Sequence, residues 1–94
     1  MKEYEIIILN EVELQIENIL NYIYLNTYNK NLVKKISDLL YWSCYSLKYF
    51  PYRFQIWFDN VRILNVKNFR IFYEIFEKER KVVIFQILWQ SQDY

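Results

Sequence analysis

The sequence predicts an α+β domain in which a helical hairpin covers one face of a small antiparallel sheet. Three observations lead to this fold class. Residues 61–94 are rich in β-branched, aromatic and aliphatic side chains, which favour strands. Apolar residues recur at helical spacing over 12–23 and again over 32–47. The single proline, Pro51, forces the second helix to end before the strands begin, because proline disfavours helical geometry in the residue before it.

The C-terminal third is predicted to form a three-stranded meander. Its strands are expected over Arg62 to Val66, Phe69 to Phe76 and Lys81 to Trp89. Lys67-Asn68 is expected to form the first turn, because Asn tolerates a left-handed backbone. The charged residues 77–80 are too polar to bury and should form the second loop.

Strand alternation divides the middle strand between two faces. One face carries Phe69, Ile71, Tyr73 and Ile75, and the other carries Arg70, Phe72, Glu74 and Phe76. Tyr73 is therefore expected in the core.

The first strand is predicted over Tyr4 to Leu9, beside the later strands. Asn10 is expected to cap the helix that follows, with Glu13 answering it in a capping box. The apolar stripe of this helix is Val12, Ile16, Ile19, Leu20 and Ile23, and residues 26–29 end the pattern.

The second helix is expected to pack antiparallel to the first. Its apolar side carries Leu32, Ile36, Leu39, Leu40 and Leu47, and another side carries Lys34, Lys35 and Asp38. Lys30, Lys34 and Lys35 form a basic patch that is typical of a solvated helix face. Tyr52 to Asn60 is either a wrapping loop or a short edge strand.

Composition excludes several kinds of chemistry. The 94 residues are expected to form one domain, 1–94, with a net charge of +1 that gives no general affinity for nucleic acid. The absence of His and the single Cys44 exclude zinc enzymes, His acid–base catalysis and Cys-His nucleophiles, so no metal and no cofactor is expected. One thiol and no visible membrane span or signal peptide predict a cytoplasmic protein.

Four stretches resemble the RelE/ParE superfamily of bacterial toxins from type II toxin–antitoxin modules. They are YEIIIL with IENILNYI after it, LKYFPYR at the end of the second helix, VRILNVKNFRIFYEI, and VVIFQILWQSQDY. The third is the most specific, because its Arg62, Leu64, Val66, Arg70 and Tyr73 match a recurrent family pattern.

The resemblance implies an antitoxin partner and one of two activities. The superfamily is also called the plasmid stabilisation protein family. Its ParE-like members inhibit DNA gyrase, whereas its RelE-like members cleave mRNA on the ribosome. Gyrase inhibition is the preferred prediction, with mRNA cleavage as the enzyme alternative and a silent interaction module as a third. Neither a metal nor a membrane is implied.

The nuclease alternative would use Arg62, Arg70 and Tyr94. A guanidinium suits phosphate because it can donate two parallel hydrogen bonds. The structural alternatives are that Arg70 pairs with a carboxylate such as Glu74 and that Arg62 is a solvated strand charge. Trp89 stands where many relatives have His, which argues against cleavage, since no proton-transfer group remains.

Aromatic side chains supply the predicted partner-binding surface. The candidates are Trp42, Tyr45, Tyr49, Tyr52, Trp57 and Trp89. Exposed aromatics are enriched at protein interfaces, so this group could seat an antitoxin. The alternative, favoured for Trp42, is that these side chains cap the core beneath the loop at Pro51. Stacking on single-stranded RNA is a further alternative, which the near-neutral charge argues against.

Overall fold

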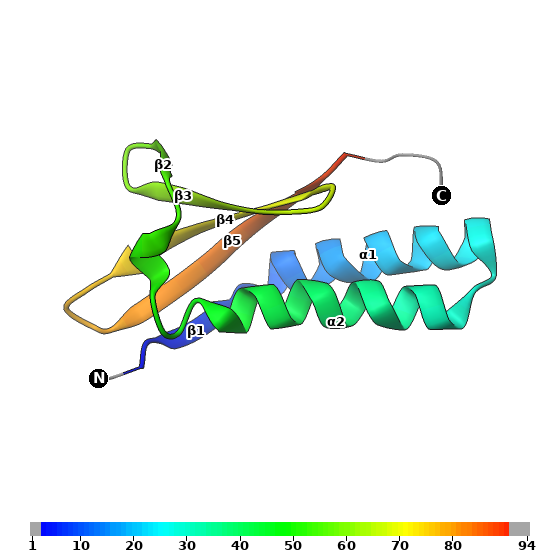
Figure 1. Cartoon of the computed structure of the whole chain (residues 1–94), viewed down its shortest axis with the longest axis horizontal. Coiled ribbons are helices and arrows are strands. Elements are labelled where there is room, and N and C mark those ends of the chain that lie inside the picture. The colour runs from blue at the N-terminus through cyan, green and yellow to red at the C-terminus, as the bar shows by residue number, and fades with distance from the viewer. Residues whose placement is uncertain (1–2, 91–94) are drawn as a thin grey trace.

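The computed structural model describes residues 3–90 (Figure 1). Its elements are β1 (Glu5–Ile8), α1 (Asn10–Thr27), α2 (Lys30–Ser46), the 3-10 helix η1 (Pro51–Arg53), β2 (Ile56–Phe58), β3 (Val61–Val66), β4 (Phe69–Phe76) and β5 (Lys81–Trp89). The predicted α+β class and the order strand, helix, helix, strands are confirmed.

The sheet is larger than predicted, with five strands in the order β1-β5-β4-β3-β2. The predicted meander is present as β3, β4 and β5, which pair antiparallel. β1 adds to one edge and runs parallel to β5, with Glu5 opposite Lys81. β2 adds to the other edge, so Tyr52 to Asn60 contains both a 3-10 turn and an edge strand. The long connection between β1 and β5, which contains both helices and the strands β2 to β4, allows these two strands to run in the same direction.

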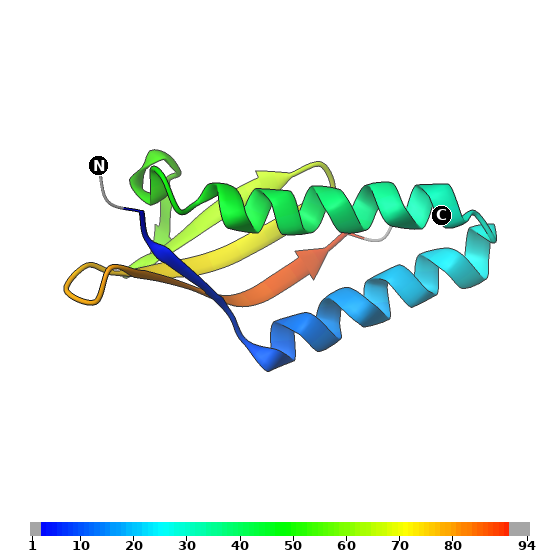
Figure 2. The ribbon, with the colours of Figure 1, turned by 90° about the horizontal axis from the view of Figure 1, so that it is seen from below.

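Both helices lie on one side of the sheet and pack antiparallel to each other (Figures 1 and 2). Most of their predicted stripes is buried there, including Val12, Ile16 and Ile23 on α1 and Ile36 and Leu40 on α2. The predicted Leu39 is not part of this core and instead lines a hollow with Trp42. Phe69, Ile71 and Tyr73 supply the sheet's share of this core, and Ile75 packs against it. The predicted apolar face of the middle strand is therefore confirmed.

A second, smaller apolar cluster lies on the other face of the sheet. Phe72 is only 5% exposed although it points away from the helices. It pairs across strands with Ile63, and the Trp57 ring meets it edge-on at 5.4 Å. Trp57 of β2 therefore covers part of the sheet face that points away from the helices, which strand alternation alone predicted to be uncovered.

A β-bulge adjusts β5 to the core. Phe72 pairs with Gln86 but Tyr73 pairs with Ile84, so Phe85 is an extra residue on β5. The bulge allows Ile84 and Ile87 to share the helix-facing side although three positions separate them.

The predicted capping box at the start of α1 is wrong. Leu9 is the N-cap, no side chain caps the helix, and Asn10 already lies in its first turn. The Leu9 amide still donates to Ile84 of the sheet at 3.2 Å, while its carbonyl accepts from the Val12 amide. The helix thus begins one residue earlier than expected. Glu13 instead accepts a hydrogen bond from the Tyr41 hydroxyl of α2.

The β3–β4 turn and the start of α2 lie near the positions that the sequence predicts. The β3–β4 turn falls at Lys67-Asn68, yet Lys67 rather than Asn68 has the left-handed backbone, with φ 50°. Asn29 caps α2 by accepting from the Leu32 amide at 3.0 Å.

Candidate interaction site

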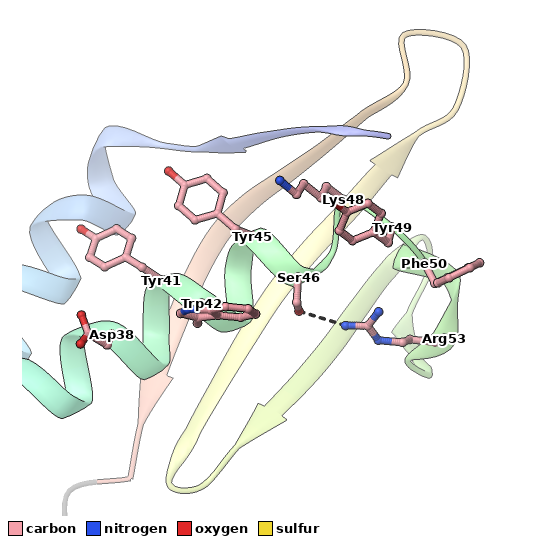
Figure 3. Close-up of a pocket in the computed structure, with 9 residues that line it drawn as sticks. All are labelled: Asp38, Tyr41, Trp42, Tyr45, Ser46, Lys48, Tyr49, Phe50 and Arg53. Atoms are coloured by element: carbon pink, nitrogen blue, oxygen red, sulfur yellow. Dashed lines mark hydrogen bonds between the residues drawn. The ribbon is translucent and has the colours of Figure 1, made fainter. Parts of the chain in front are cut away.

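An open groove of about 650 Å³ lies where α2 ends and the chain turns toward the sheet. Its lining comes from the outer side of α2 and from the segment that follows it (Figure 3). The lining residues are Asp38, Tyr41, Trp42, Tyr45, Ser46, Lys48, Tyr49, Phe50 and Arg53. We call this feature the aromatic groove.

Large exposed side chains form the walls of the aromatic groove. Trp42 is 75% exposed, and Tyr45, Tyr49 and Phe50 are each about half exposed. Trp42 and Tyr45 are three positions apart and therefore share one side of α2. The buried side of the helix carries Leu40 instead. The expectation that Trp42 caps the core is wrong, because it points away from that buried side.

Two cations stand beside these aromatic walls. The Arg53 guanidinium donates to the Ser46 hydroxyl at 2.9 Å and lies 4.7 Å from the centre of the Phe54 ring. The Lys48 ammonium is 3.9 Å from a Glu3 carboxylate oxygen and 5.4 Å from the Tyr49 ring centre. Within residues 3–90, Arg53 has no carboxylate partner.

The one carboxylate of the aromatic groove is already neutralised. Asp38 accepts from Lys34 at 3.1 Å, one helical turn earlier on α2. The carbonyl end of α2 adds a partial negative charge of about half a unit, which the full charge of Arg53 exceeds. The groove is therefore apolar with a positive margin.

A cluster of hydrogen bonds holds the neighbouring hollow in shape. This second pocket is lined by Tyr4, Tyr49, Phe50, Pro51, Tyr52, Arg53 and Arg80. Glu77 accepts from the Tyr4 hydroxyl at 2.7 Å, from the Tyr52 hydroxyl at 3.1 Å and from Arg80 at 3.1 Å. We call these four residues the Glu77 cluster. It joins the segment before β1, the turn η1 and the β4–β5 loop.

Hydrogen bonding shifts two pKa values in the Glu77 cluster. The hydrogen bond from Tyr4 is the largest cause that lowers the pKa of the Glu77 carboxyl, with smaller contributions from Tyr52 and Arg80. The same bond, with burial second, raises the pKa of Tyr4 to about 12. Glu77 is therefore an anion, and Tyr4 a neutral donor, at neutral pH.

Arg62 is held by backbone carbonyls. Its guanidinium donates to the carbonyl of Tyr52 at 3.2 Å and to that of Phe54 at 2.6 Å, and lies 5.0 Å from the Tyr52 ring centre. Arg62 is half-buried and sits opposite Tyr73, on the helix-facing side of the sheet. This arrangement fixes the path of the chain from η1 to β2.

Arg70 lies on the other face of the sheet. It falls between the buried residues Phe69 and Ile71, so its side chain points away from the helices, and it is exposed. Within residues 3–90 it has no ion pair, and the expected pairing with Glu74 is not formed. Arg62 and Arg70 therefore do not converge on one point. Tyr94, the third nuclease candidate, lies outside the described residues.

Metal-binding and membrane-spanning features are both absent from the part of the chain that the structure describes. Over 3–90, no group of three or more acidic, Cys or His side chains is arranged to hold a metal ion. Neither helix in that range combines the length and the apolar content that a membrane span needs.

Comparison with known proteins decides the family. A family model described as the ParE toxin of the type II toxin–antitoxin system parDE matches residues 6–94. The chain belongs to this family of ParE toxins. A search of curated proteins finds no significant match to it.

The fold of this ParE-family chain also occurs in a solved toxin–antitoxin complex. The crystal structure of the complex RelBE2 from Mycobacterium tuberculosis contains a similar chain, with a TM-score of 0.66 and 11% sequence identity. The similarity covers 98% of this chain and 97% of that one. At this identity the comparison supports the fold alone.

The structure brings together only part of the predicted partner-binding set of this ParE-family chain. Trp42, Tyr45 and Tyr49 meet in the aromatic groove, whereas Tyr52 belongs to the Glu77 cluster. Trp57 lies on the far face of the sheet. Trp89 is also separate: it stacks on Phe69 at 6.2 Å and meets Tyr22 edge-on at 5.4 Å.

Among the groove residues that sequence reasoning missed, Phe50 and Arg53 matter most for its character. Both flank Pro51, where helical spacing no longer indicates which side chains meet. The signal that could have identified them is the prolyl turn itself, since it folds the chain back along the end of α2.

Proposed function

We propose that this ParE-family toxin acts by binding and inhibiting DNA gyrase in the cytoplasm and is neutralised by a cognate antitoxin. The observation that carries this proposal is the position of Arg62 and Arg70 on opposite faces of the sheet. A protein that inhibits its target by binding needs exposed surface rather than a converging set of catalytic groups.

An RNA-cleaving site needs charges that converge on one phosphate and a group that transfers a proton. Here the Arg62 guanidinium is engaged by two carbonyls, and the chain contains no His. These features favour target binding over cleavage. The mRNA interferase alternative depends on Arg70, which is exposed and has no ion pair over 3–90.

The antitoxin is proposed to cover the aromatic groove. The groove exposes a contiguous aromatic patch made of Trp42, Tyr45, Tyr49 and Phe50. Exposed apolar patches mark interaction sites, and buried aromatic side chains contribute much of the binding energy at protein interfaces. The similar chain of known structure belongs to a toxin–antitoxin complex, which agrees with a partner of this kind.

Controlled expression in a bacterial host tests the proposal. We expect induction of the DNA-damage response with filamentation, loss of supercoiling activity by purified gyrase on adding the protein, and intact transcripts. Co-expression of the reading frame that adjoins this gene should restore growth. Cut transcripts with blocked translation would support the interferase instead, and normal growth would support a silent interaction module.

Arg70→Ala provides a further discrimination between the two activities. An interferase that uses Arg70 should lose transcript cleavage in this variant. The matched control is Lys78→Ala, another exposed cation on a loop of the same sheet.

A further inference from the structure

The aromatic groove combines an apolar, aromatic wall with a positively charged margin. Its walls are aromatic and half exposed or more, whereas its margin carries Arg53 with no carboxylate partner over 3–90. A guanidinium forms five N–H donors, and the bond to Ser46 uses one of them. The remaining donors are available to a planar acceptor such as a carboxylate.

The arrangement also presents this cation in a fixed position. Ser46 holds one nitrogen of Arg53, and the Phe54 ring lies beneath the guanidinium plane at 4.7 Å. An arginine held in this way loses less side-chain entropy on pairing with a ligand than a free one does. Figure 3 shows its guanidinium directed at Ser46, on the same margin of α2 that carries Trp42.

We infer that the aromatic groove takes one amphipathic peptide segment of the antitoxin, with a large apolar side chain against Trp42 and Tyr45 and a carboxylate paired with Arg53. The inference rests on the proposed function and adds the chemistry of the partner. Charge complementarity carries it, because Asp38 is paired with Lys34 and the net charge of the groove margin is positive.

Single-stranded RNA would also pair anions with cations and stack on aromatic rings. It would need a track of several cations along the backbone. Among the residues that line the groove, Lys48 and Arg53 are the cationic ones, and Lys48 is shared with Glu3. One directed cation beside a broad aromatic wall fits a peptide better than a polynucleotide.

The test uses the purified product of the adjoining reading frame that restores growth, and tiled peptides of roughly 15 residues from its sequence. Binding to the full-length toxin is measured by titration calorimetry. We expect Trp42→Ala and Arg53→Gln each to raise the Kd about tenfold or more, and Arg53→Glu to raise it further. The controls are Leu25→Ala, an exposed apolar side chain on α1, and Lys30→Gln at the far end of α2. Both should stay within about twofold.

Charge reversal identifies the carboxylate. In the peptide that binds, each Asp or Glu is changed to Lys in turn, and one such change should restore binding to Arg53→Glu while weakening binding to the wild type. Circular dichroism of every toxin variant verifies the fold. If Arg53→Glu fails to fold, a double-mutant cycle between Arg53→Gln and each Asp→Asn or Glu→Gln change in the peptide identifies the same carboxylate.

Two results would overturn the inference. One is binding of the antitoxin with unchanged affinity to Trp42→Ala and Arg53→Gln. The other is tight binding of a labelled single-stranded RNA of about 12 nucleotides that Arg53→Gln abolishes. Failure of the proposed function would look different, because no adjoining product would then restore growth or bind the wild-type toxin.

Discussion

At the scale of single residues, Tyr73 connects the core of the sheet to the turn that shapes the aromatic groove. It is fully buried, and its hydroxyl donates to the Pro51 carbonyl at 2.6 Å. Burial raises its pKa to about 12, so it remains a donor throughout the neutral range. Strand alternation placed Tyr73 in the core correctly, but alternation alone could not reveal this bond to a residue 22 positions away.

Removing that hydroxyl is expected to destabilise the protein. Tyr73→Phe should lower the free energy of unfolding by about 1–3 kcal/mol, because the buried Pro51 carbonyl loses its donor. Urea titration followed by tryptophan fluorescence measures the change. Tyr28→Phe, at a position 74% exposed, is the control and should change it by less than about 0.5 kcal/mol. Equal stability of the two variants would contradict a structural role for the bond.

Substitution of the two arginines of the nuclease alternative should have different effects on the free energy of unfolding. Arg62→Ala should lower the free energy of unfolding by about 1–3 kcal/mol, since two carbonyls lose a charged donor. Arg70→Ala should leave it within about 0.5 kcal/mol. Thermal and urea unfolding of both variants test this. A stable Arg62→Ala variant would reopen the possibility that Arg62 is free to contact a phosphate.

At the scale of elements, β4 is buried on both sides at its centre. Ile71 faces the helices and is fully buried, while Phe72 faces β2 and is 5% exposed. We therefore expect both Ile71→Ala and Phe72→Ala to cost about 2–5 kcal/mol. Chemical denaturation of each variant measures the cost. Trp57→Ala is the companion variant, because it uncovers Phe72 and should cost less. A tolerated Phe72→Ala would mean that β2 does not cover that face.

The Glu77 cluster, which ties the β4–β5 loop to the turn η1 and to the segment before β1, should make the stability of the fold depend on pH. The folded pKa of Glu77 lies below its ordinary value of 4.5, so its contribution to stability is present above that value and is lost as the pH falls through the lower, folded pKa. The melting temperature of the wild type should exceed that of Glu77→Gln near pH 7, and the difference should shrink as the pH falls below the ordinary pKa of 4.5. Glu79→Gln, on the same loop, is the control. A constant difference at all pH values would exclude the carboxylate as its source.

Secondary structure was more predictable than the contacts between elements. Periodicity gave the stripes of both helices and the two faces of β4, because each pattern depends on neighbours in sequence. The capping box failed because Leu9 remains hydrogen-bonded to Ile84, a partner that local sequence does not indicate. The far-face cover of Phe72 was missed for the same reason, since Trp57 comes from a short edge strand. For the candidate site, the clustering of aromatic residues near the end of the second helix grouped Trp42 with Tyr45, but Arg53 lies in the groove because of tertiary packing.

At the scale of the whole molecule, Cys44 reports on global unfolding. The thiol is fully buried in the core between the helices and the sheet, and burial raises its pKa to about 12. It should therefore resist a thiol reagent such as DTNB at pH 8 until the whole fold opens. The reference is the urea-unfolded protein, in which the Cys44 thiol should react with DTNB rapidly and completely.

The rate of that labelling should follow stability. A variant destabilised by about 1.4 kcal/mol, such as Tyr73→Phe, should label about tenfold faster than the wild type when opening is rapid and reversible. Tyr28→Phe should label at the wild-type rate. Fast labelling of the native wild type would mean that α2 opens locally without the sheet.

The place of β5 in the sheet affects how the toxin can be made. β5 lies between β1 and β4 and is the partner on which β1 depends, although the whole helical hairpin is synthesised before it. A ribosome that has translated only as far as the β4–β5 loop therefore carries a chain in which β1 has no partner strand. The helices of that chain also lack the part of the sheet that β5 and β1 provide. Such a nascent chain should be protease-sensitive and harmless until Lys81–Trp89 has emerged. An antitoxin that is already present can therefore bind the fold as soon as it is complete.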